Sequence, residues 1–203
     1  MPSGYRRLGC LPADRFIPAL MEHRNTRDYV GLLSAARYHG SAHHRPQELQ
    51  VVLERNRPAI VCGSVKITIV SRRNLPAVPV ESFNNPRGTV VVSTVKAKAV
   101  DFVGYMRRAG GLDRVAGVLS DLGEDMEPEH LVEASESVPI PWAQRLGHLP
   151  EHVGAGEEVV LLKEHVRQRA RNLTRLLPGK SVTNAHRSKD WRLFVNSAVE
   201  VDA

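Results

Sequence analysis

The sequence predicts an α+β fold in which a small, mostly antiparallel sheet packs against a helical second half. Between residues 49 and 93, short runs rich in Val and Ile are separated by Gly, Pro and Asn, which is typical of strands joined by turns. From residue 94 to residue 177, apolar side chains recur at intervals of three and four, which indicates helices. A sheet-rich segment followed by a helical one is typical of α+β proteins.

The first 48 residues are predicted to form a helical lead-in. Apolar residues between positions 16 and 21 predict a short helix that is interrupted near Pro18, because proline cannot donate a helical hydrogen bond. A second short helix is expected over residues 29–40, where Gly40 is a natural C-cap. The small side chains of this second helix would let another element pack closely against it.

Short segments of the sheet-rich region have the composition of strands. Within one of them, Val65, Ile67 and Ile69 alternate with polar residues, as expected for a strand with one buried face. Turns rich in Asn, Pro and Gly separate the segments, so we expect antiparallel neighbours joined by tight turns. The predicted strands cover residues 50–53, 59–62, 64–70, 77–80 and 89–92.

Helices are predicted after Ser93 and Thr94, which form an N-cap. The longest helical pattern carries one apolar stripe and ends at Pro178-Gly179. A loop and a final strand over residues 191–201 complete the chain. The expected helices cover residues 95–107, 112–122, 129–135, 142–149 and 154–177. Residues 1–203 are expected to form a single domain, with segments 1–48 (helical lead-in), 49–93 (sheet-rich), 94–177 (helical) and 178–203 (loop and final strand).

The composition is that of a globular protein with a basic balance of charge. Of the 203 residues, 42% are hydrophobic and 25% are charged, which is enough to build a buried core. The net charge of +6 favours nucleic acid or an acidic protein as a partner, although an arginine-rich codon bias accounts for part of the arginine excess. We expect a cytoplasmic protein without a membrane partner, because we find no membrane-spanning run, no secretory signal and only two cysteines.

Four basic residues are predicted to share one flank of the longest helix, because they are spaced four apart: Lys163, Arg167, Arg171 and Arg175. Such a stripe could bind an anionic partner. Positive charge near the C-terminus of a helix also interacts favourably with the helix dipole. A solvated helix face therefore explains the pattern equally simply. Both interpretations stay open.

Residues 178–181, Pro-Gly-Lys-Ser, resemble the second half of a phosphate-binding loop. The full motif needs a glycine where Thr174 stands, so a helix C-cap with an exposed lysine is the favoured interpretation. If the protein binds phosphate, Lys180 and Ser181 are the first candidates. No catalytic motif is recognised, and no metal site is predicted, because the histidines near position 40 lack neighbouring Cys or carboxylate ligands.

Several stretches of the chain depart from generic patterning. They are YVGLLSAARYHG at 29–40, HHRPQELQVVL at 43–53, RGTVVVSTVKAKAVDF at 87–102, AGGLDRVAGVLSDL at 109–122, WAQRLGHL at 142–149 and WRLFVN at 191–196. By their order and spacing, rather than by any one of them, these stretches resemble the antitoxins of the AbiEi family. The Ser93-Thr94 pair is usually followed in the family by Pro and Glu, whereas Val95 and Lys96 stand here.

The resemblance implies that the chain is the antitoxin of a bacterial toxin–antitoxin, or abortive-infection, system. Its partner would be a nucleotidyltransferase-like toxin, usually encoded beside the antitoxin. Family members typically carry an N-terminal winged helix-turn-helix before the segment that is GYRRLG at 4–9 here. Because this segment begins almost at Met1, we expect toxin neutralisation rather than operator binding.

Two other functions are left open. The chain could be an atypical protein kinase that phosphorylates its toxin, and only then would ATP with Mg be a cofactor. It could instead bind operator DNA and repress its own operon through its basic surface. Whether the protein is an enzyme, and whether it forms a homodimer, is open at this stage.

Overall fold

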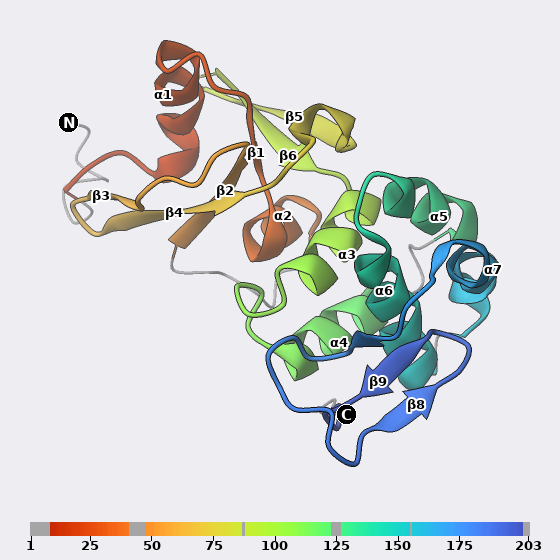
Figure 1. Ribbon diagram of the computed structural model, residues 1–203. Helices are drawn as coiled ribbons and strands as arrows, with labels where there is room; N and C mark the ends of the chain where they lie inside the picture. The colour runs from red at the N-terminus through yellow and green to blue at the C-terminus, as the bar shows by residue number, and fades with distance from the viewer. Residues whose placement is uncertain (1–8, 41–47, 87, 123–126, 155, 201–203) are drawn as a thin grey trace. The chain divides into compact units, whose positions relative to one another are not determined.

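The structure, a computed structural model, describes residues 9–40, 48–86, 88–122, 127–154 and 156–200 (Figure 1). The chain is an α+β protein, as predicted. It forms two compact units, Met1–Thr94 and Val95–Ala203. The boundary between them coincides with the predicted change from a sheet-rich to a helical segment. None of the helices in the described ranges is long and apolar enough to cross a membrane.

The first unit holds a six-stranded mixed sheet in the order β3-β4-β2-β1-β6-β5. Its hairpins β3–β4 and β5–β6 are antiparallel, as expected of strands joined by tight turns. However, β2 runs parallel to β4 and β1 parallel to β6, so consecutive strands are not always neighbours. The strands are β1 (Asp28–Val30), β2 (Glu48–Leu53), β3 (Ile60–Cys62), β4 (Val65–Ser71), β5 (Val80–Asn85) and β6 (Gly88–Ser93).

The exposure of β2 and of β3 agrees with their places in the sheet. Four consecutive residues of β2 are buried, as in a strand that is covered on both faces. In β3, by contrast, Val61 is 68% exposed, which suits a short strand at the edge of the sheet. In the sheet, β4 lies between β2 and β3. The strand predicted over residues 77–80 is wrong before Val80, because Ala77 ends a 3-10 turn (Leu75–Ala77) and β5 begins only at Val80.

Two short helices complete the first unit. Helix α1 (Ile17–His23) contains Pro18 in its first turn, where the missing N–H costs no hydrogen bond, so the proline starts the helix instead of interrupting it. Its Ile17 and Met21 pack into one core cluster with Val51, Leu53, Ile67 and Ile69 of the sheet. Helix α2 (Leu32–Tyr38) contributes Ala35 to a second cluster with Val30, Val90 and Val92.

The helix predicted over residues 29–40 begins only at Leu32. Tyr29 and Val30 instead form part of β1, where they pair with Val52 and Val51 of β2. Both side chains are almost fully buried, so the sheet gains more from them than a helix would. Gly31 makes the change of direction sterically allowed, because a Cβ there would lie 2.8 Å from the Val52 side chain.

Asp28 begins β1 at a cost in stability, because burial raises the pKa of its carboxyl to about 6 from 3.8. The folded state therefore binds this proton more tightly than the unfolded chain does. The penalty is full above about pH 6 and is relieved as the pH falls toward 4. We expect Asp28→Asn to raise the free energy of unfolding at about pH 8 by roughly 1–3 kcal/mol, and the gain to shrink at acid pH.

Denaturant unfolding of both proteins between about pH 4 and pH 8 measures this difference. Glu81→Gln, which removes an exposed carboxylate of β5 in the same unit, serves as the control. A gain for Asp28→Asn that is independent of pH would contradict the assignment of the cost to the buried charge.

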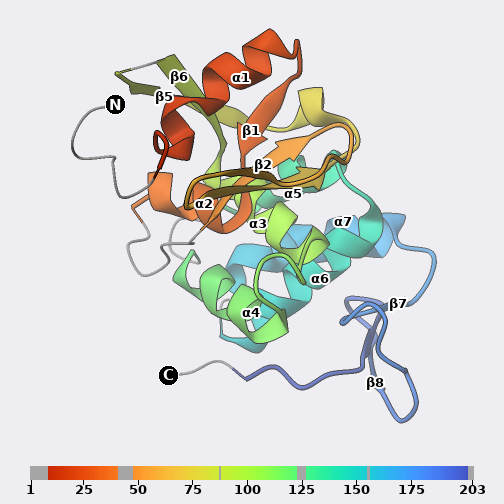
Figure 2. The same ribbon diagram turned by 90° about the vertical axis from the view of Figure 1, so that its left-hand side faces the viewer.

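The second unit is mainly helical, with a three-stranded sheet in the order β7-β9-β8. Helix α6 contacts α3, α4, α5 and α7 (Figures 1 and 2). The helices are α3 (Val95–Gly104), α4 (Leu112–Asp121), α5 (Pro128–Glu136), α6 (Ile140–His152) and α7 (Val160–Arg169). The strands are β7 (Thr174–Arg175), β8 (His186–Ser188) and β9 (Leu193–Val195). The first four predicted helices are confirmed to within a few residues, and β9 confirms the core of the final strand.

The long helix predicted over residues 154–177 is wrong beyond Arg169. The backbone of Ala170 is already extended, and Thr174 and Arg175 pair with β9 as the short strand β7. Leu173, which the helical stripe would bury, is 41% exposed. Pairing with a distant strand therefore overrides the local helical pattern, and Pro178-Gly179 does not cap a helix.

Close glycine contacts fix the tryptophans of this unit. A Cβ on Gly147 of α6 would lie 2.0 Å from the Trp191 ring, and one on Gly104 would lie 2.3 Å from the Trp142 ring. Gln144, also on α6, donates from Nε2 to the carbonyl of Trp191 at 3.2 Å. The small sheet is thus tied to α6 by packing and by hydrogen bonds.

Candidate functional site

The four predicted basic residues do not lie along one helix. Lys163 and Arg167 are on α7, whereas Arg171 follows its end and Arg175 belongs to β7. The spacing of four therefore places only the first two on one helical flank. The predicted stripe is corrected to two helical residues and two residues beyond the end of the helix.

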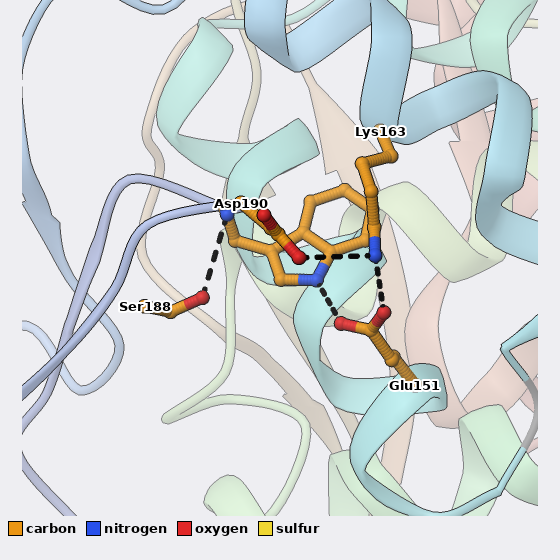
Figure 3. A network of polar contacts seen from close by, with 5 residues as sticks. Glu151, Lys163, Ser188 and Asp190 are labelled. Atoms are coloured by element: carbon orange, nitrogen blue, oxygen red, sulfur yellow. Dashed lines mark hydrogen bonds and ion pairs between the residues drawn. The ribbon is translucent and has the colours of Figure 1, made fainter.

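Lys163 lies between two carboxylates and over the ring of Trp191 (Figure 3). Its Nζ is 2.5 Å from Oε1 of Glu151 on α6 and 3.4 Å from Oδ2 of Asp190. The indole Nε1 of Trp191 donates to the other oxygen of Glu151, and the Trp191 amide donates to Oγ of Ser188 at 3.4 Å. This network joins α6, α7 and the β8–β9 connection.

The network holds Lys163 and Glu151 in their charged forms. The hydrogen bond to Glu151 raises the pKa of Lys163 against the effect of desolvation. Burial by itself would raise the pKa of Glu151, but the hydrogen bonds from Lys163 and Trp191 lower it overall. Because the charge of Lys163 is satisfied inside the unit, this residue supports the surface more than it offers a free cation to a partner.

The other cations of the predicted stripe are more accessible. The side chain of Arg167 is 75% exposed and contacts Glu164 one turn before it, with its Nε 2.8 Å from Oε2. Arg171 and Arg175 are exposed, and no acid lies within ion-pair range of either among the residues that the structure describes. The backbone carbonyl of Arg175 accepts a hydrogen bond from Arg145 at 2.9 Å, so its position is fixed while its guanidinium stays in solvent.

The segment with Lys180 and Ser181 is not a phosphate-binding loop of the kind that its sequence resembles. It follows β7, and turns rather than a helix come after it. Lys180 donates to Oγ of Ser197 at 3.1 Å, and Oγ of Ser181 lies 2.8 Å from Oγ1 of Thr183. Without the N-terminus of a helix behind it, the loop lacks the convergent N–H groups that bind phosphate in that motif.

The loop nevertheless gathers positive charge from two parts of the unit. Nδ2 of Asn196 donates to the carbonyl of Lys180 at 3.0 Å and so holds the loop against β9. Arg107 reaches the same loop, since a Cβ on Gly179 would be 2.8 Å from its Nη2. A shallow hollow lies beside it, lined by residues 104–108 together with Leu177 and Pro178. Lys180 and Arg107 are both exposed.

A second basic site, which the sequence analysis missed, lies at one end of the six-stranded sheet. A cavity of about 400 Å³ opens there between the turn before β1 and the segment after β2. The register that pairs Asp28 with Leu53 brings these two segments together. We call this space the arginine cavity. Its lining consists of Arg24, Asn25, Thr26, Arg27, Leu53, Glu54, Arg55 and Arg57.

The arginine cavity carries four exposed guanidinium groups, those of Arg24, Arg27, Arg55 and Arg57. Within the described part of the chain, no acid forms an ion pair with any of them. The turn that holds the first two is well defined, because the amide of Thr26 donates to the carbonyl of Met21 and its Oγ1 donates to the carbonyl of Arg24. The cations are thus presented on an ordered backbone.

A signal for this site exists in the sequence. Arg-Asn-Thr-Arg at 24–27 and Arg-Asn-Arg at 55–57 are two arginine-bracketed turns of similar composition. Their proximity follows only from the pairing of β1 with β2. Residues 29–40 were predicted to be a helix, so this pairing could not be foreseen.

Comparison with known proteins places these features in a family. The family model of the AbiEi antitoxin C-terminal domain matches residues 29–152, which include parts of both units. The chain is also similar to the crystal structure of the RV2827C protein from Mycobacterium tuberculosis. The TM-score is 0.60 at 14% identity over 89% of this chain and 67% of that one, so the two share a fold. No curated protein matches the chain.

Proposed function

The chain belongs to the AbiEi antitoxin family, and we propose that it neutralises a nucleotidyltransferase-type toxin by binding to it directly. The family match over residues 29–152 carries this proposal, since an antitoxin domain implies a toxin as its partner. The toxin would be encoded beside this chain. Direct binding agrees with the exposed basic residues of both units, because complementary charge accelerates and orients association.

We assign part of the toxin contact to the exposed cations around β7. Arg167, Arg171 and Arg175 occupy the end of α7 and the chain that leads into the small sheet, and Lys180 with Ser181 follows in the next loop. Lys163 supports this surface from within through its contacts with Glu151 and Asp190. An acidic face of the toxin is the complementary partner.

Co-expression with the neighbouring toxin, purification at moderate salt and intact mass measurement test the proposal together. We expect a stable complex in which the mass of the toxin is unchanged. A toxin that gains the mass of one phosphate when ATP and Mg are supplied would replace direct binding by phosphorylation. A chain that forms no complex but binds its upstream DNA specifically would favour operon repression instead.

The contact surface is tested by Arg171→Gln/Arg175→Gln. Because exposed charges at the rim of an interface act mainly on association, we expect the Kd for the toxin to rise by about tenfold, with a weaker salt dependence. Arg37→Gln/Arg114→Gln removes the same charge from other exposed positions and is the matched control. Equal weakening by both double variants would mean that only net charge matters.

A further inference from the structure

The arginine cavity carries more positive charge than its described lining offsets. Four guanidinium groups line a space of about 400 Å³, and Glu54 is the one acidic residue among the described residues of the lining. Like charges held close together repel and reduce the stability of the folded state. Such an arrangement is compensated when a partner brings negative charge into the cavity.

Guanidinium groups select for particular partners. Each one presents parallel N–H donors that match the two oxygens of a carboxylate or a phosphate. The volume is within the range of cavities that enclose a ligand or a few side chains, roughly 300–1,000 Å³. The cavity is therefore suited to an anionic group that enters it, rather than to diffuse attraction.

The lining favours carboxylates over nucleic acid. No aromatic residue is among the described residues that line it, whereas proteins that bind single strands or nucleotides commonly stack bases on aromatic rings. A protein that binds along duplex DNA can contact about six to ten phosphates, whereas this lining is a compact hollow with four arginines.

We propose that the arginine cavity is an anchor point for an acidic segment of the toxin, whose Asp or Glu side chains pair with Arg24, Arg27, Arg55 and Arg57. This inference rests on the proposed function and adds a second contact on the first unit. The hydrogen-bonded turn at residues 24–27 limits the backbone entropy that is lost there on binding.

The test measures the Kd of the full chain for the toxin by calorimetry at two salt concentrations. Arg24→Gln/Arg27→Gln and Arg55→Gln/Arg57→Gln are each expected to raise the Kd by about 30-fold or more, because they leave acidic groups of the toxin unpaired. Arg37→Gln/Arg114→Gln loses the same charge outside the cavity and should change the Kd by less than about threefold. Thermal unfolding of each variant confirms that it is folded.

The outcomes separate the two proposals. If the parent chain binds the toxin and both cavity variants bind it with the parental Kd, the inference is overturned and the proposed function stands. If the parent chain forms no complex, the proposed function fails. Titration with ATP and with upstream duplex DNA completes the test, since a cavity variant that loses only phosphate binding would overturn the carboxylate assignment. Charge reversal of the matching toxin acid should restore binding to Arg55→Glu/Arg57→Glu.

Discussion

Replacing Gly147 by alanine is expected to destabilise the second unit by about 3 kcal/mol or more. In the middle of an exposed helix, the same change would stabilise the protein by up to about 1 kcal/mol. Here the new Cβ would lie 2.0 Å and 2.1 Å from two ring atoms of Trp191, which is completely buried and cannot move aside without disturbing the core. The contact therefore reverses the sign of the effect.

Urea unfolding followed by circular dichroism measures this change. Gly156→Ala is the control, because its Cβ would meet its nearest neighbour, the Glu151 side chain, at an ordinary 3.9 Å. The smaller ring in Gly147→Ala/Trp191→Phe should recover part of the loss, so the double variant is expected to be more stable than the sum of the single effects. Additive losses would contradict the steric explanation.

Replacing Asp101 by alanine is expected to destabilise the second unit by about as much as Gly147→Ala does. Lys98 and Asp101 lie one turn apart on α3, and both side chains are completely buried. Burying a charge is tolerated when an opposite charge lies near it. We therefore predict that the two charges compensate each other, and that Asp101→Ala alone lowers the free energy of unfolding by about 3–5 kcal/mol.

A double-mutant cycle tests this prediction. Because Lys98→Met/Asp101→Leu removes both charges, it should cost much less than the sum of its single changes. Lys96→Met on the same helix breaks a pair with Glu133, which is 60% exposed, and is expected to cost less than about 1 kcal/mol. If the costs of Lys98→Met and Asp101→Leu simply add, the two residues are not coupled.

The elements that the sequence predicts correctly have local causes. Alternation in the β4 segment and the turns rich in Asn, Pro and Gly predict the β3–β4 hairpin and the position of β6, whereas the extent of β5 is missed. Apolar periodicity predicts α4, and the expected helix at 142–149 covers the middle of α6. These features depend on neighbours in sequence, and they survive in the folded chain.

The errors arise where a distant strand decides the structure. Tyr29 and Val30 pair with β2, and Thr174 and Arg175 pair with β9. Both segments nevertheless carry a helical pattern in the sequence. The candidate sites follow the same rule. The predicted basic stripe is divided by the end of α7, and the arginine cavity exists only because β1 pairs with β2.

Titration of the toxin's enzymatic activity with this chain tests the central claim most directly. If neutralisation is direct binding, activity should fall in proportion to the added chain, reach zero near equimolar amounts, and return when high salt dissociates the complex. Full toxin activity in the presence of excess chain would contradict the claim. Inhibition that persists after the two proteins are separated would contradict it as well, because it would show a covalent change in the toxin.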